Sequence, residues 1–221
     1  PEYLEYVDGR VQARGNPQQA MPMQQLIAIS LFNTALLPAG VGPGMEATCV
    51  YNYPKAGPRD EKQRSNYAAT YANVVHASAI EIDPLSGAYK VLKYVVVHDA
   101  GTLVNPMVVE GQVHGATAHS LGSAMLEEFV YDEEGQHLTA TFNEYLCPKA
   151  TDIPDMHLEH LCSPSPFTAH GVKGMGEGGG PVPALIAQAI EDAIGDPGLE
   201  ITSSHNPPES VFRLMRERGM N

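Results

Sequence analysis

The chain has 221 residues, of which 43% are hydrophobic, so it is long enough to bury a substantial core. Its 26 acidic residues outnumber 13 basic ones, and the net charge of −13 argues against nucleic acid or an anionic membrane as a partner. No apolar run reaches the ~20 residues of a membrane span. The three cysteines form neither a disulfide framework nor a Cys-x-x-Cys pair, which favours a reducing compartment, so we expect a cytoplasmic protein.

Residues 1–44 are predicted to form a leading hairpin and a helix. Residues 3–14 alternate around Asp8-Gly9, which is the strongest short hairpin signal. Residues 23–37 carry apolar side chains at helical spacing, and the Pro/Gly-rich segment 38–44 ends this helix. The main unit is then expected over residues 45–221.

The main unit mixes predicted strands and helices. Residues 67–83 and 89–98 are alternating and β-branched, and the Pro/Gly turn between them predicts a long antiparallel hairpin. The other predicted strands are 46–53, the hairpin pair 127–131 and 137–140, and 156–161. The other predicted helices are 108–125, 181–194 and 206–217. Residues 54–65 are predicted to form a charged loop. Because these elements do not alternate as βαβ units, we predict an α+β fold with antiparallel hairpins, a mixed sheet and packed helices.

A glycine-rich segment, residues 171–180, places one carboxylate, Glu177, in a loop with few other side chains. The loop opens onto the helix 181–194, whose first N–H groups and partial positive charge favour an anion, and glycines let a bulky ligand approach the backbone. A plain turn is the alternative. The match to GxGxxG at 174–179 lacks a βαβ unit, and no Lys-Ser/Thr pair follows to make a P-loop.

The helix 108–125 carries Gln112 among small residues, which would let it lie close to a ligand or, alternatively, to another helix. These small residues are Gly111, Gly115, Ala116, Ala118 and Gly122. His114 and His119 share a helical face poorly, and His157 and His160 are interpreted as one exposed edge. The histidines therefore predict no protein-ligated metal.

Three segments together resemble the large subunit of the molybdenum hydroxylases, the family of xanthine dehydrogenase, aldehyde oxidoreductase and carbon monoxide dehydrogenase. They are 99–106 (Asp-Ala-Gly-Thr-Leu-Val-Asn-Pro), 110–122, and 171–179 with the small-residue helix after it. The resemblance runs from about Asp8 to Arg216. It implies that residues 1–221 are the C-terminal portion of a molybdopterin-binding domain and a piece of a longer chain. The family's other molybdenum-contacting loops lie upstream, so these 221 residues alone are not expected to retain molybdenum.

The resemblance also implies a reaction and its residues. The chain would be part of an oxidoreductase that hydroxylates an aldehyde, an N-heterocycle or a related small molecule with oxygen from water. Glu177 would be the general base, because a carboxylate enclosed by a ligand has a raised pKa that suits proton transfer near neutral pH. The cofactor-binding residues would be Gly111, Gln112, Lys173, Gly174, Met175 and Gly176.

The implied cofactor is molybdenum held by molybdopterin, with the cytosine dinucleotide form as one alternative, so the chain would supply no metal ligand. Iron–sulfur clusters and FAD would lie on other domains or subunits, since three cysteines are too few for a usual cluster. The implied partners are those subunits and the upstream half of the same subunit, in an oligomeric enzyme. The alternative is a catalytically silent binding or scaffold module that keeps the fold.

Overall fold

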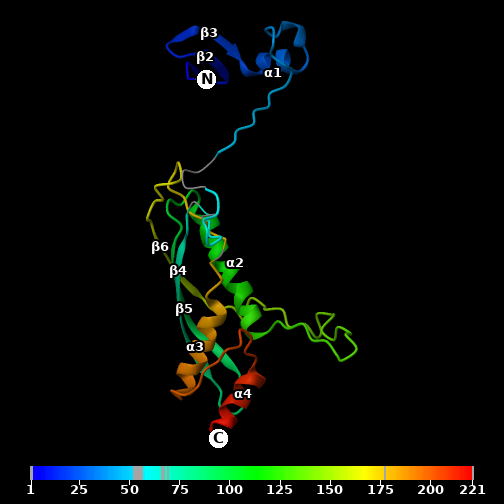
Figure 1. Ribbon diagram of the computed structural model, residues 1–221, viewed down its shortest axis with the longest axis vertical. Coiled ribbons are helices and arrows are strands. Elements are labelled where there is room, and N and C mark those ends of the chain that lie inside the picture. Colours follow the sequence, from blue (N-terminus) through cyan, green and yellow to red (C-terminus); the bar gives the residue numbers. More distant parts are fainter. Residues whose placement is uncertain (1, 52–56, 66–67, 69, 177, 221) are drawn as a thin grey trace. The chain divides into compact units, whose positions relative to one another are not determined.

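The computed structural model describes residues 2–51, 57–65, 68, 70–176 and 178–220 (Figure 1). The chain divides into two compact units, residues 1–52 and 53–221, and each is described by itself. No helix among the described residues is long and apolar enough to cross a membrane.

The first unit begins with a three-stranded antiparallel sheet in the order β1-β2-β3. Strands β1 (Leu4–Val7) and β2 (Arg10–Ala13) form the predicted hairpin, with Asp8 and Gly9 in the left-handed region as an Asp-Gly turn requires. Strand β3 (Asn16–Pro22) was not predicted, because its two prolines and polar residues hide any alternation. As an edge strand it tolerates both prolines.

Helix α1 (Met23–Leu31) and the short 3-10 helix η1 (Thr34–Leu36) occupy the predicted helical segment. Ser30 is the polar exception in the apolar stripe, and the structure explains it. Its hydroxyl donates a 2.6 Å hydrogen bond to the carbonyl oxygen of Gly44, so a buried polar group is satisfied.

The second unit is built on a three-stranded sheet in the order β4-β5-β6, formed by β4 (Asn73–Ile82), β5 (Tyr89–Asp99) and β6 (Met156–Leu161). Strands β4 and β5 are antiparallel and β6 is parallel to β5, which confirms the predicted α+β class with a mixed sheet. Helices α2 (Pro106–Met125), α3 (Val182–Ile194) and α4 (Pro208–Glu217) complete the unit (Figure 1).

The core lies between one face of this sheet and the helices. It consists of Val91, Tyr94 and Val96 of β5, Val113, Leu121 and Ala124 of α2, Val182, Ile186, Ile190 and Ile194 of α3, and Leu199, Val211 and Met215. The opposite face leaves Val75, Leu92 and Leu161 exposed. Burial on one face explains why the alternating patterns of β4 and β6 could be read from the sequence.

Two predicted strand regions are wrong. Residues 46–51 are extended but exposed and belong to no strand, and residues 52–53 of that prediction lie outside the described residues. The hairpin 127–140 is reduced to one bridge, between Tyr131 and His137. An alternating segment becomes a strand only where a neighbouring strand takes its hydrogen bonds, and a two-stranded ribbon is marginal alone.

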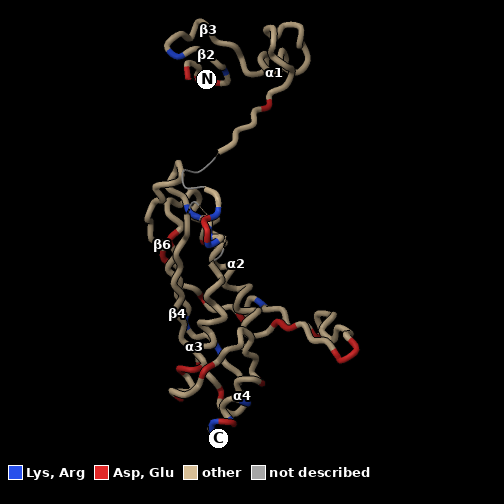
Figure 2. Tube along the Cα trace, in the orientation of Figure 1, with Lys and Arg blue, Asp and Glu red and all other residues tan. Residues whose placement is uncertain are grey.

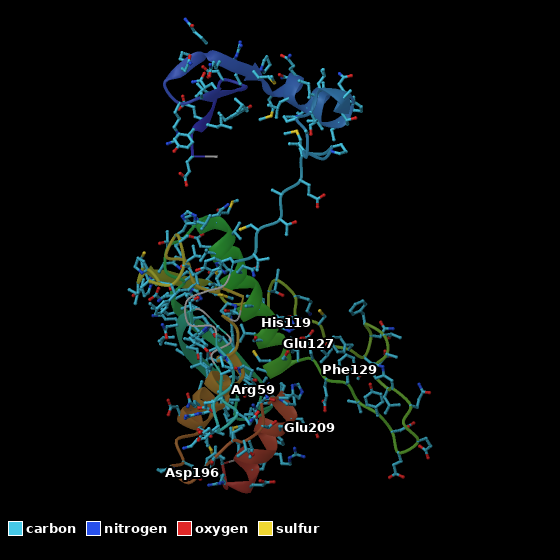
Figure 3. The ribbon with its side chains drawn as sticks, turned by 45° about the horizontal axis from the view of Figure 1, so that its top comes forward. Arg59, His119, Glu127, Phe129, Asp196 and Glu209 are labelled. Carbon is cyan, nitrogen blue, oxygen red and sulfur yellow. The ribbon has the colours of Figure 1, made fainter. Side chains whose placement is uncertain are left out.

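Residues 127–147 instead form an irregular arm that projects from the C-terminal end of α2, with acidic residues at its tip (Figure 2). Figure 3 shows Phe129 at the base of this arm and His119 on α2. The ring of Phe129 packs against His137 and Tyr145 at centroid distances of 5.3 Å.

Candidate functional site

The glycine-rich loop 171–180 connects the end of β6 to α3 and contacts both α2 and the sheet. Gly178 accepts a hydrogen bond from β4, and Gly179 packs against α2. Helix α3 begins at Val182, so the loop does open onto a helix N-terminus. Glu177 itself lies outside the described residues.

A groove of about 380 Å³ lies between the loop and α2. It is lined by Gln112, Gly115, Ala116, His119 and Ser120 of α2 and by Gly176, Gly179 and Gly180 of the loop. The structure thus brings together two of the predicted cofactor-binding residues, Gln112 and Gly176, which are far apart in the sequence. Lys173, Gly174 and Met175 do not line this groove.

The small residues of α2 fall into two groups. At one end, a side chain on Gly179 of the loop would clash with the carbonyl of Ala116, and one on Gly122 would meet the ring of Pro148, so close packing favours glycine at both positions. Around Gly111 and Gly115, by contrast, no described atom beyond the adjacent residues and the surrounding backbone of α2 lies within 4 Å of where a Cβ would be. Packing among the described residues therefore accounts for one end of the small-residue stripe, and the end beside Gln112 is open.

Gln112 is exposed on this open end of α2. No hydrogen bond joins its amide to another residue that the structure describes. The amide therefore keeps two donors and an acceptor for a ligand in the groove. Its role in holding a cofactor stays a prediction.

Lys173 forms an ion pair with Asp99, at the end of β5. The Nζ–Oδ2 distance is 3.1 Å, and the side chains are only 11% and 9% exposed. Burial alone would raise the pKa of Asp99, but hydrogen bonds from the backbone N–H groups of Gly101 and Ser163 and from Lys173 outweigh it. These donors hold the pKa of this carboxyl well below its usual range. The Lys173 ammonium thus fixes the loop to the sheet with one of its three donors.

The backbone reinforces this attachment. The N–H of Lys173 donates to the carbonyl of Ala100 at 2.9 Å, and the carbonyl of Gly171 accepts from Thr102 and Ser165. Gly101 has a φ of 65°, and a Cβ there would clash with the carbonyl of Gly171, so only glycine fits this approach. Sequence reasoning noticed the segment 99–106 but assigned no role to Asp99, because its partner is 74 residues away.

A second cavity, of about 390 Å³, lies on the sheet side of the loop. Its lining includes Tyr71, Val74, His98, Gly174 and Gly178, so Gly174 faces a different space from Gln112. His98 is buried, and its Nδ1 has no partner among the described residues. Met175 is partly buried and packs against the hydrophobic core.

The interpretation of His157 and His160 as one exposed edge is wrong. His157 is exposed and pairs with Glu159, whereas both ring nitrogens of His160 are buried and its ring lies against that of His98, 6.4 Å away between centroids. Residues three apart on a strand point to opposite faces. Among the described residues, no three His, Cys, Asp or Glu side chains are placed to hold a metal ion together.

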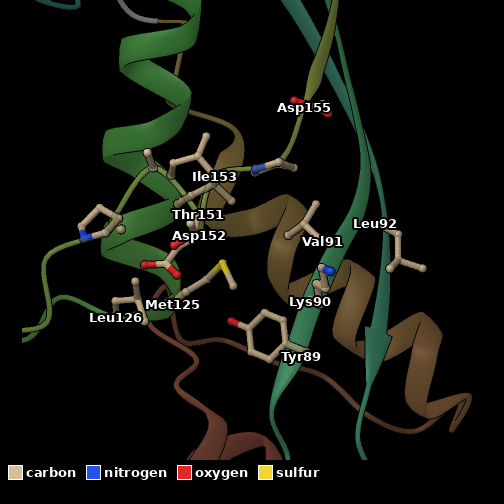
Figure 4. A pocket seen from close by; sticks show the side chains of 15 residues that line it. Tyr89, Lys90, Val91, Leu92, Met125, Leu126, Thr151, Asp152, Ile153 and Asp155 are labelled. Atoms are coloured by element: carbon tan, nitrogen blue, oxygen red, sulfur yellow. The ribbon is translucent and has the colours of Figure 1, made fainter.

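The larger cavity of the second unit, about 580 Å³, lies elsewhere (Figure 4). Tyr89, Val91 and Leu92 of β5 line it together with Met125 and residues of the segment 148–155. It contains none of the residues that the sequence predicts to be functional. The groove beside Gln112 and the glycine loop is therefore the better candidate site.

Comparison with known proteins identifies relatives over the whole chain. The family model described as the molybdopterin cofactor-binding domain matches residues 1–154. The nicotine 6-hydroxylase large subunit of Paenarthrobacter nicotinovorans is 30% identical over 95% of this chain and 24% of its own length. The carbon monoxide dehydrogenase large chain of Afipia carboxidovorans is 32% identical over 86% of this chain and 22% of its own.

Among solved structures, quinoline 2-oxidoreductase from Pseudomonas putida 86 aligns with a TM-score of 0.71 and 35% identity, covering 98% of this chain and 26% of that one. The chain thus spans about a quarter of the length of these relatives.

Proposed function

Because the chain belongs to the molybdopterin cofactor-binding domain family of the molybdenum hydroxylases, we propose that it forms part of an oxidoreductase that hydroxylates a small organic molecule with oxygen from water. The observation that carries this proposal is the groove in which Gln112, whose amide has no hydrogen-bond partner among the described residues, and the open surface of α2 face the glycine loop.

The residues of this groove fit a pterin cofactor. Gln112 offers hydrogen bonds to the polar edge of a ring system, and Gly115 and Gly176 leave room for a flat ligand to approach the backbone; Gly111, which does not line the groove, stays a predicted contact. Lys173, Gly174 and Met175 stay predicted contacts, although Lys173 would have to serve the cofactor and Asp99 together. When bound, the molybdenum cofactor would supply the redox chemistry, and the protein would bind and orient it.

Glu177 is the proposed general base. Its carboxylate would accept the proton of the water molecule that provides the oxygen atom. The flanking glycines contribute no side chains that would compete for the space in front of it. The substrate class follows from the relatives, two of which are named for the N-heteroaromatic compounds nicotine and quinoline. We propose an N-heterocycle, or an aldehyde or related small molecule, as the substrate.

The remaining parts of the enzyme are proposed by the same reasoning. Relatives named as a large subunit and a large chain support an assembly with other subunits. Those subunits or domains would hold the iron–sulfur clusters and the flavin that take electrons away. The cytosine dinucleotide form is one candidate for the cofactor.

Isotope labelling tests the proposed reaction. The purified intact enzyme, with the upstream part of the subunit and its partner subunits, should contain molybdenum and, when incubated with quinoline or a related N-heteroaromatic compound in H₂¹⁸O, should give a product carrying ¹⁸O. The matched control, ¹⁸O₂ in ordinary water, should give an unlabelled product. A protein that binds no molybdenum and turns over none of these compounds would instead support the silent scaffold module.

In the intact subunit, Gln112→Ala should weaken cofactor binding without abolishing the fold. Each lost hydrogen bond contributes about 0.5–1.5 kcal/mol, so the affinity for the cofactor should fall roughly 2- to 13-fold for each bond that is lost. The fraction of protein that carries cofactor should fall accordingly. Molybdenum and pterin content measured against protein concentration checks this. His114→Ala is the matched control, because His114 is exposed on the same helix but does not line the groove. Full occupancy in Gln112→Ala would return Gln112 to the role of a helix-packing residue.

A further inference from the structure

One histidine of the sheet is bound to the glycine loop. His76, in the middle of β4, places its Nε2 2.7 Å from the carbonyl oxygen of Gly178, which is 102 residues further along the chain. Its other ring nitrogen, Nδ1, lies 2.9 Å from the hydroxyl of Tyr94 on β5. The two rings meet edge to face, with centroids 5.7 Å apart.

The partners fix the tautomer of His76. A carbonyl oxygen can only accept, so Nε2 must carry the hydrogen and donate it to Gly178. In a neutral ring Nδ1 is then an acceptor, and the Tyr94 hydroxyl donates to it. Burial is the main cause that lowers the pKa of His76, with a smaller effect of His98 in the same direction, whereas the bond to Gly178 opposes it. Burial also raises the pKa of Tyr94, which therefore keeps its proton.

The hydrogen bond from His76 to Gly178, called the anchor below, matters because Gly178 directly follows Glu177 in the sequence. Glycine has more backbone freedom than any other residue, so the backbone at Gly176 and Gly178 is fixed only where other contacts hold it. Upstream, Lys173 is paired with Asp99. Downstream, Gly179 packs closely against α2, and between Lys173 and Gly179 the described residues include the hydrogen bond from His76 to Gly178, the residue that follows Glu177 in the sequence.

We propose that His76 is a positioning residue that holds the Gly178 carbonyl, and thereby the part of the loop next to the proposed base, with Tyr94 selecting the ring tautomer that can do so. The inference rests on the proposed function of Glu177 as the base. The anchor itself, however, is a property of the chain and is measurable without turnover.

The test compares two variants of equal length in the full protein. His76→Gln keeps an N–H donor that reaches about as far as Nε2, and His76→Met fills the same space without a donor. Hydrogen exchange of the peptide spanning residues 174–181, followed by mass spectrometry with and without cofactor, reports the loop directly. His76→Met should speed exchange by about tenfold or more, while His76→Gln stays within about threefold of the wild type.

Kinetics provide the second readout. His76→Met should lower kcat about 10- to 100-fold with KM and molybdenum content within about twofold, and His76→Gln should restore most of kcat. His157→Met is the control, because His157 is an exposed histidine of β6 and should change neither measurement. Equal exchange in the Gln and Met variants overturns the proposal, whatever the activity of either.

Two further outcomes are decisive. If His76→Met does not fold, the ¹⁵N chemical shifts of His76 in the wild-type protein show which ring nitrogen carries the hydrogen. A neutral ring protonated at Nδ1, or a charged ring, contradicts the proposed arrangement, in which Nε2 donates to Gly178 and Nδ1 accepts from Tyr94. If exchange responds as expected but Glu177→Gln retains full activity, the anchor stands and the proposed base fails. The two ideas can therefore be separated.

Discussion

Replacing Glu177 with Gln should lower turnover by at least ~10²–10⁴-fold while molybdenum and pterin content stay near wild type. The amide keeps the size and much of the hydrogen bonding of the carboxylate but cannot accept a proton. Glu177 is the sole carboxylate between Glu159 and Glu191 in the sequence, so no neighbouring residue of the loop can replace it. Reduction of the cofactor by substrate should slow by the same factor, because the lost proton transfer precedes electron transfer.

Cofactor content and pre-steady-state reduction must be measured together for this variant. Glu159→Gln is the matched control, since that carboxylate is exposed on β6 and its partner is the exposed His157. Activity within a few-fold of wild type, with cofactor intact, would place the base elsewhere. The glycine loop would then serve only to bind an anionic group of the ligand. Loss of cofactor in Glu177→Gln would give Glu177 a structural role instead.

The sequence predicted elements whose signals are local. The Asp8-Gly9 turn, the alternation of β4 and β5 and the apolar stripe of α3 each depend on neighbouring residues, and the structure contains all of them. Residues 46–51 and the arm show the limit of such signals. Their patterns suit strands, but in the described part of the chain no neighbouring strand pairs with 46–51, and one bridge joins the two sides of the arm.

The candidate site was predictable in its parts but not in its connections. The glycine loop stood out by residue type, and the family resemblance favoured a binding role for Gln112 over helix packing; the structure places Gln112 and part of the loop at one groove. The contacts that fix the loop, from His76 to Gly178 and from Asp99 to Lys173, join residues 102 and 74 positions apart. They depend on how the sheet and loop meet in space, which no local pattern encodes. Lys173 illustrates the difference, because a lysine beside glycines suggests a ligand, whereas its partner in the structure is a carboxylate of the same chain.

Lys173→Met should destabilise the protein by roughly 3–5 kcal/mol, the usual result when one partner of a buried ion pair is removed. We expect the lower end of this range, because Asp99 keeps the backbone donors Gly101 and Ser163 after the change. Denaturant unfolding of the cofactor-free protein measures the effect, and Lys149→Met, at an exposed lysine, is the control. Adding Asp99→Asn to Lys173→Met should recover part of the loss, because no unpaired charge then stays buried.

The pH dependence of this loss distinguishes the ion pair from a role in cofactor binding. The folded-state pKa of Asp99 lies below its unfolded-state value of about 3.9, so the carboxylate stabilises the fold above that pH, and the stabilisation is lost as the pH falls through the folded-state pKa. The stability difference between wild type and Lys173→Met should therefore be full at pH 7 and should shrink below about pH 4. If Lys173 instead acts mainly on cofactor oxygens, the cofactor-free variant should be as stable as wild type at pH 7, and only cofactor occupancy should fall.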